Sequence, residues 1–176
     1  MNSAQTIIET KRLILRELKI SDDTGMFELD SDVDVHKYLG NKPVKSIEES
    51  RKIIETIQQQ YTENGIGRWA TIEKSTNQFI GWAGLKLITE PINNHVNYYD
   101  LGYRLIKKYW GLGFATEAAK ASLEYGFNTL GQDMIYGMAD IQHSASIHIL
   151  QKVGLKPIEN FWHVGIHHVW LKADKK

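Results

Sequence analysis

The sequence predicts an α/β domain with a mixed, mostly antiparallel β-sheet flanked by helices. Two observations carry this prediction. The segments Arg68–Glu73 and Gln78–Leu87 are rich in branched and aromatic residues and meet at the turn 74–77, which is typical of an antiparallel hairpin. The strand pattern of Tyr98–Ile106 is followed by a helical pattern and then by a second strand pattern, Met134–Ala139. These last two strands should lie parallel, joined by a right-handed crossover.

The segments before the hairpin predict one strand and three helical pieces. Arg12–Leu18 alternates in polarity and should form the opening strand. Ser21 begins a helix, because a capping hydroxyl is followed by two acids in the first turn. Val33–Leu39 is a short second piece. Ser46 opens the next helix through a capping box, and its apolar stripe consists of Ile53, Ile54, Ile57 and Tyr61.

The second half of the chain predicts two further helices and a terminal pair of strands. Thr116–Leu130 has apolar residues at spacings of three and four and ends at Gly131. Ser144–Val153 shows the same period. Lys156–Ile158 and His163–Leu171 should form the final strands.

Length and composition bound the classes of function. The 176 residues suit one domain, 1–176, with a core of about residues 9–171. Lysine and arginine number 21, as do aspartate and glutamate, and this zero net charge argues against a general nucleic-acid binder. The chain has no cysteine, which excludes disulfides and a thiol nucleophile. Met1–Thr6 should be loosely ordered and is too polar for a signal peptide. With no long apolar run, we expect a cytoplasmic protein without membrane contact.

The turn between Tyr98–Ile106 and the following helix has the features of an anion site. Glycines at positions 111 and 113 would let a phosphate approach the backbone, and the first turn of the helix carries N–H groups without helical partners. We therefore predict a phosphate-bearing ligand at residues 111–116. An ordinary strand-to-helix connection is the alternative.

Residue types narrow the choice of ligand. A Walker-type loop needs Lys followed by Ser or Thr after its last glycine, but Phe114 and Ala115 stand there. A dinucleotide fingerprint needs a third glycine where Thr116 lies, and an acid at the end of the next strand. Asp133 precedes that strand. The dinucleotide interpretation, an oxidoreductase, is therefore weak.

Two motifs resemble the GNAT superfamily of N-acetyltransferases. Tyr99–Leu105 reads YDLGYRL and Tyr109–Ala118 reads YWGLGFATEA, and both are similar to the core of that superfamily. The branch that they resemble includes the enzymes that acetylate ribosomal-protein N-termini on alanine or serine. Three further segments resemble the same branch in the expected order: Thr10–Arg16, Phe79–Leu85 and Ser146–Leu155.

The resemblance implies a binding mode for acetyl-CoA. The two parallel central strands should splay, with the coenzyme in the gap between them. It implies that the backbone of Arg104 and Leu105 bonds the pantetheine arm. The pyrophosphate should bind the turn at Trp110, Gly111, Leu112, Gly113, Phe114, Ala115 and Thr116.

The resemblance also implies candidates for the chemistry. Asp100 is the candidate base for the amine, with an ion-paired strand carboxylate as the alternative. Glu117, in the first helical turn, more often has a capping role. Ser146 could hydrogen-bond the thioester sulfur, or bond its own helix instead. The tyrosine that many members carry in the last helix is Leu150 here, and the asparagine that contacts pantetheine is His143.

These observations predict an enzyme that transfers an acetyl group from acetyl-CoA to a primary amine, by direct attack in a ternary complex. The acceptor would be a protein N-terminus or a small-molecule amine. The alternative is a non-catalytic acyl-CoA-binding module, suggested by His143 and Leu150. A homodimer through exposed strand edges is compatible with the sequence. We predict no metal site, because His167 and His168 would point to opposite faces of a strand.

Overall fold

The computed structural model describes residues 8–176, so the expectation for Met1–Thr6 lies outside it. One eight-stranded sheet forms the centre, in the order β1-β2-β3-β4-β5-β6-β8-β7. All neighbouring strands are antiparallel except β5 and β6, which are parallel. The predicted mixed, mostly antiparallel sheet is therefore confirmed. The strands are β1 (Ile8–Glu9), β2 (Leu13–Arg16), β3 (Trp69–Glu73), β4 (Gln78–Ile88), β5 (Tyr98–Leu105), β6 (Met134–Asp140), β7 (Lys156–His163) and β8 (Ile166–Asp174).

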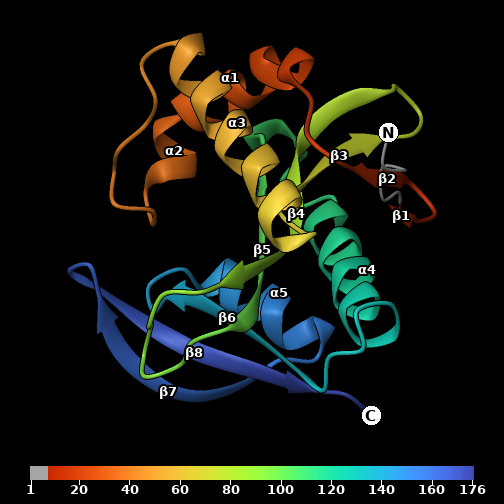
Figure 1. The fold of residues 1–176 in the computed structure, drawn as a ribbon. Helices are drawn as coiled ribbons and strands as arrows, with labels where there is room; N and C mark the ends of the chain where they lie inside the picture. The colour runs from red at the N-terminus through yellow and green to blue at the C-terminus, as the bar shows by residue number, and fades with distance from the viewer. Residues whose placement is uncertain (1–7) are drawn as a thin grey trace.

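The helices divide between the two faces of this sheet (Figure 1). On one side lie α1 (Asp23–Ser31), α2 (Val33–His36) and α3 (Ile47–Asn64), and on the other lie α4 (Phe114–Asn128) and α5 (Ser144–Val153). Helix α4 packs against β4, β5 and α5. The loop between β5 and α4 thus leads from the sheet centre to the start of a long helix.

Local sequence explains where the long helices begin and end. Helix α3 starts at Ser46, whose hydroxyl accepts a hydrogen bond from the Glu49 amide, and stops at Gly65 in the left-handed conformation. Its Ile54 and Ile57 are buried in the main core. Helix α4 has no side-chain cap, because its N-cap residue is Gly113. This second helix start therefore leaves its amide groups available.

The last two strands differ from the prediction. They form one longer hairpin, with β7 reaching His163 and β8 beginning at Ile166. Val164 and Gly165, both with positive φ, make the tight turn. Strand β7 lies at the sheet edge and most of it is exposed, so Glu159 and Asn160 are tolerated within it and hide the apolar alternation on which the prediction relied.

Candidate active site

The parallel strands β5 and β6 are paired at only one register point, Asp100 with Tyr136. Beyond this point the two strands separate toward their carboxyl ends. Helix α4 follows β5 and helix α5 follows β6, so the unpaired ends of the two strands, called the gap from here on, lie between the starts of these two helices. Ligands of α/β sheets commonly bind at such a point.

Backbone direction decides which groups of β5 face the gap. The Ile106 amide donates to the Ile80 carbonyl, and alternation in an antiparallel pair then turns the main chain of Arg104 toward β4 as well. A Cβ on Gly81 would lie 2.2 Å from the Arg104 carbonyl oxygen, which fits this direction. Tyr103 and Leu105 instead present their main chain to the gap.

The structure therefore corrects the expectation for Arg104 by one residue. Tyr103, rather than Arg104, offers main-chain groups beside those of Leu105. The Leu105 carbonyl is itself engaged, because the indole N–H of Trp110 donates to it at 2.7 Å. Trp110 is thus tied to the end of β5, while its ring remains partly exposed beside the glycine turn.

The glycine turn presents a row of free amide groups. Gly111 and Gly113 have φ values of 73° and 80°, in the left-handed region that favours glycine. Within the described chain, none of the amides from Gly111 to Thr116 donates to a protein acceptor. The amide of Glu117 is the first to close a helical bond, to the Gly113 carbonyl. An anion would satisfy these donors at the positive end of the α4 dipole.

Arg12 of the β1–β2 connection holds this turn in place, a contact that the sequence analysis missed. Its Nη1 donates to the Leu112 carbonyl at 2.9 Å, and its guanidinium lies 4.3 Å from the centre of the Phe114 ring. A Cβ on Gly113 would lie 3.4 Å from Arg12 Nη2. A partly exposed cation therefore stands beside the predicted phosphate site.

Glu117 anchors Arg12 and does not extend toward the gap. Its carboxylate accepts from Arg12 Nε at 2.7 Å, from the Arg12 amide at 2.8 Å and from the Thr10 hydroxyl at 2.6 Å. Burial acts to raise the pKa of Glu117, but these hydrogen bonds outweigh it and hold the pKa below its ordinary value. Glu117 is therefore a structural anion that joins α4 to the start of the sheet.

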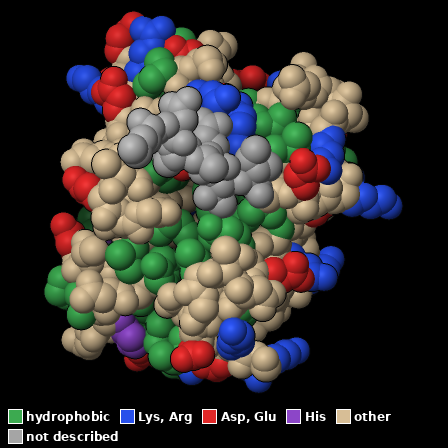
Figure 2. Space-filling view, turned by 45° about the vertical axis from the view of Figure 1, so that its right-hand side comes forward, with side chains coloured by type: hydrophobic (Ala, Val, Ile, Leu, Met, Phe, Trp, Pro, Cys, Tyr) green, Lys and Arg blue, Asp and Glu red, His purple; other side chains and the backbone are tan. Residues whose placement is uncertain are grey.

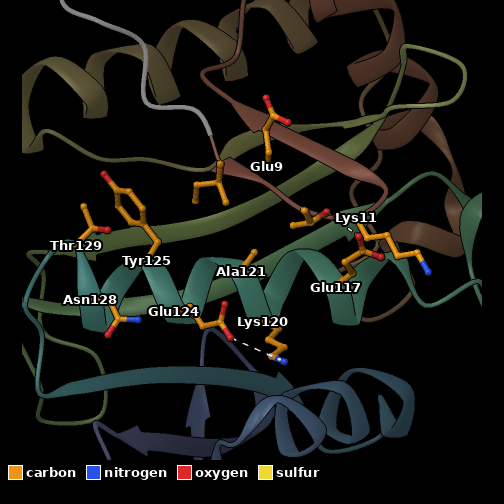
Figure 3. Close-up of a pocket in the computed structure, with 11 residues that line it drawn as sticks. Glu9, Lys11, Glu117, Lys120, Ala121, Glu124, Tyr125, Asn128 and Thr129 are labelled. Carbon is orange, nitrogen blue, oxygen red and sulfur yellow. Dashed lines mark hydrogen bonds and ion pairs between the residues drawn. The ribbon is translucent and has the colours of Figure 1, made fainter.

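Glu117 also borders a groove of about 650 Å³ between β1 and α4 (Figure 3). Lys11, Lys120 and Glu124 contribute charges of both signs to its lining. This groove runs along the outside of α4, whereas the free amides lie at that helix's first turn. It is thus a separate site from the gap between β5 and β6.

Asp100 lies on β5 at the base of the gap and is paired with Arg68. Arg68 Nη2 donates to the carboxylate oxygen Oδ2, and Nη1 donates to the Asp100 carbonyl at 2.5 Å. Gly102 makes room for this arginine, since a Cβ there would lie 2.7 Å from Arg68 Nη2. Burial raises the pKa of the Asp100 carboxyl, and the charge of Arg68 opposes the rise. The other oxygen, Oδ1, accepts no hydrogen bond from the described part of the chain.

Ser146, near the start of α5, contacts β5 across the gap. The Tyr103 hydroxyl donates to the Ser146 carbonyl at 2.8 Å and lies 3.1 Å from Ser146 Oγ. In the described chain the Ser146 hydroxyl therefore has a partner on β5 and none within its own helix. Leu150, one turn farther along α5, is 1% exposed and belongs to the core, so this helix offers no hydroxyl at that position.

His143 stacks on Tyr38 at the start of α5. His143 is the N-cap residue of α5 but makes no capping hydrogen bond with its side chain. Its ring stacks on Tyr38, which follows α2, with centroids 4.3 Å apart. Burial lowers the pKa of His143, although Asp140 acts in the opposite direction. The two helix layers thus meet at an aromatic pair beside the position of the implied pantetheine contact.

Helices α1 and α2 are joined by ion pairs to β5 and to the short turn Lys107–Tyr109 that follows it. The Arg104 side chain donates to Asp30 of α1 at 2.6 Å, and Asp30 is 1% exposed. Lys107 and Lys108 bind Asp34 and Glu28 at 2.5 and 2.9 Å. Arg104 therefore contributes through its side chain, which holds the overhanging helices against the strand that borders the gap.

Residues 8–176 were found to contain neither a cluster of metal ligands nor a membrane-spanning helix. Figure 2 shows one face, where charged side chains of both signs lie around a hydrophobic centre. Over residues 8–176, no group of three or more His, Cys, Asp or Glu side chains could hold a metal ion. None of the helices described here has both the length and the apolar character needed to cross a membrane.

The sequence is similar to those of known acetyltransferases. The profile of the acetyltransferase (GNAT) domain family matches residues 12–156. The uncharacterized N-acetyltransferase YoaA of Bacillus subtilis is 31% identical over 150 residues, which cover 85% of this chain and 82% of the relative. The spermidine N(1)-acetyltransferase of Escherichia coli K12 is 26% identical over 80% of this chain and 70% of its own.

Solved structures agree on the fold. A GNAT-family acetyltransferase from Bacillus anthracis superposes with a TM-score of 0.80 at 23% identity, over 96% of this chain and 98% of its own. The ribosomal-protein-S5-alanine acetyltransferase of Vibrio fischeri gives 0.76 at 15% identity, over 96% of each chain. At such identities these structures support the fold alone. The profile match over most of the sequence shows that the chain belongs to the GNAT acetyltransferase family.

Proposed function

We propose that this protein transfers an acetyl group from acetyl-CoA to a primary amine, by direct attack within a ternary complex. The observation that carries the proposal is the row of amides from Gly111 to Thr116, which have no acceptor within residues 8–176 and follow the strand β5 that borders the gap. A diphosphate would satisfy those donors, and a slender pantetheine chain would fit beside the main chain of Tyr103 and Leu105. His143, at the start of α5, has a side chain without a capping hydrogen bond, and its ring nitrogen could bond an amide of that chain.

The amine must lose a proton before it attacks. At neutral pH only about one in a thousand molecules of an ordinary primary amine is unprotonated, which corresponds to roughly 4 kcal/mol. Asp100 is the group of this chain proposed to receive that proton. Because Oδ2 is held by Arg68, the proton would pass to Oδ1, through a water molecule given the short side chain. The bound acetyl-CoA supplies the activated thioester.

Acetylation of an amine panel tests the proposal. The purified protein, acetyl-CoA and a set of amines should release free coenzyme A thiol together with a product 42 Da heavier than the acceptor, a mass fixed by the acetyl group. The panel should include spermidine and a peptide with N-terminal alanine, because relatives of this fold are named for such acceptors. Coenzyme A binding without transfer to any amine would instead favour the non-catalytic module, for which the engagement of Asp100 by Arg68 is the supporting observation.

A substitution of Arg12 tests the phosphate site. We expect Arg12→Gln to raise the KM for acetyl-CoA about tenfold, because it removes a cation worth about 1–2 kcal/mol beside the diphosphate and releases the Leu112 carbonyl. The value of kcat should change less, since Arg12 contacts the turn at Leu112 and Phe114 and not the groups proposed for the chemistry. Steady-state kinetics with varied acetyl-CoA measures both constants.

Lys11→Gln is the matched control, because Lys11 is the neighbouring cation and lies on the separate groove instead. It should leave the KM for acetyl-CoA unchanged. An equal effect of both substitutions would mean that Arg12 acts only through general surface charge.

A further inference from the structure

The Tyr103 side chain reaches from β5 to helix α5, which follows β6 on the other side of the gap. It lies three residues beyond Asp100, the last point at which β5 pairs with β6, so its strand has already separated there. Its hydroxyl nevertheless reaches Ser146 on α5, at 2.8 Å from the carbonyl oxygen and 3.1 Å from Oγ. The Tyr103 phenol of β5 therefore sets the hydrogen bonding of the Ser146 hydroxyl on α5.

The hydroxyl of Ser146 differs from that of an ordinary helical serine. Ser122 in α4 shows the ordinary case, because its Oγ donates to the Ala118 carbonyl of its own helix at 2.8 Å. The only partner of Ser146 Oγ in the described chain is the Tyr103 hydroxyl. Ser146 Oγ is thus directed away from its own helix, toward the Tyr103 hydroxyl of β5.

The hydroxyls of Tyr103 and Ser146 each have one proton to donate. Tyr103 has one O–H proton, and the shorter contact gives it to the Ser146 carbonyl. The phenol oxygen can then accept the proton of Ser146 Oγ. When another acceptor enters the gap, Ser146 can turn its proton to that acceptor while the phenol turns its own proton to Oγ. Burial raises the pKa of Tyr103, so the phenol stays protonated and remains a donor.

We propose that Tyr103 is a positioning residue that holds the Ser146 hydroxyl as the hydrogen-bond donor to the sulfur of the leaving thiolate. This inference rests on the proposed function. In the transfer, the amine nitrogen bonds to the thioester carbon, the C–S bond breaks, and its electron pair passes to sulfur. The proton lost by nitrogen passes through a water molecule to Asp100 Oδ1, and the departing thiolate takes a proton from solvent. Ser146 and Tyr103 donate hydrogen bonds and undergo no net proton change.

Three variants test the pair as a unit: Tyr103→Phe, Ser146→Ala and the double variant. We expect Tyr103→Phe and Ser146→Ala each to lower kcat about tenfold, with the KM for acetyl-CoA within about twofold of wild type. The double variant should be no slower than Ser146→Ala alone, because a positioning residue has no effect once its target is removed. Tyr99→Phe, on the same strand face, is the control and should keep the wild-type kcat.

For each variant, calorimetry measures the affinity for coenzyme A, and thermal unfolding measures the stability of the fold. The inference would be overturned if the kcat of the double variant fell by the product of the two single losses. A Tyr103→Phe enzyme with kcat within about twofold of wild type would overturn it as well. Loss of coenzyme A binding along with kcat in Tyr103→Phe would also overturn it, since the phenol would then support the gap rather than Ser146. A wild-type protein that binds coenzyme A but acetylates no amine refutes the proposed function, and this inference with it. That result is distinguishable from an active wild type whose Tyr103→Phe variant is unimpaired.

Discussion

Gly113→Val is expected to weaken coenzyme A binding about 100-fold or more. Gly113 has a φ of 80°, which a β-branched residue adopts only with strain, so the turn should rearrange and withdraw its amides. Losing two charge-assisted hydrogen bonds to the diphosphate, at about 1.5 kcal/mol or more each, corresponds to that factor. Calorimetric titration of the wild type and the variant with coenzyme A measures the change.

Gly131→Val provides the matched control. Gly131 follows α4 at its other end, has a φ of 67°, and has no neighbouring atom within 4 Å of an added Cβ. The two substitutions should impose a similar backbone cost of about 1–2 kcal/mol on folding. Only Gly113→Val should lose coenzyme A binding. Wild-type affinity in a folded Gly113→Val protein would show that the turn is not the phosphate site.

Asp100→Ala should produce the largest loss of stability, about 3–5 kcal/mol. The substitution leaves the Arg68 guanidinium, whose side chain is 11% exposed, without its charged partner in the interior. The same variant should lose at least about 100-fold in kcat, because the proposed acceptor of the amine proton is gone. Chemical denaturation and steady-state kinetics measure the two effects.

A double variant separates these two effects. In Arg68→Met with Asp100→Leu, apolar side chains replace the whole ion pair, and most of the lost stability should return. Activity should not return, because the proton acceptor is still missing. If the stable double variant turns over at the wild-type rate, Asp100 serves the fold and the base lies elsewhere.

The local patterns of the chain predicted the helix, the strands and the turn that frame the candidate site, because each of these lies within one short segment. Helix and strand periods, together with the glycines at 111 and 113, were sufficient for the order β5, turn, α4 and for the parallel strand β6. The capping box at Ser46 likewise marked the start of α3. In each case the decisive interactions join residues only a few positions apart.

The contacts that complete the site join distant residues, and the sequence alone could not predict them. Arg12 reaches Leu112, and Tyr103 reaches Ser146, because the sheet brings their elements together. The prediction for the Arg104 main chain was wrong for a related reason. Successive residues of a strand direct their N–H and C=O groups to opposite neighbouring strands, so an error of one residue selects the wrong neighbour. Strand β7 was predicted too short because its exposed edge position tolerates polar residues.

The central claim is that the diphosphate of coenzyme A binds the backbone amides between Gly111 and Thr116. Titration of isotope-labelled protein with coenzyme A, followed by amide NMR spectra, tests it residue by residue. We expect the largest shifts at residues 111–116, with further shifts at Tyr103 and Leu105. Shifts concentrated at Lys120, Glu124 and Asn128 in the groove outside α4, with the turn unchanged, would contradict it.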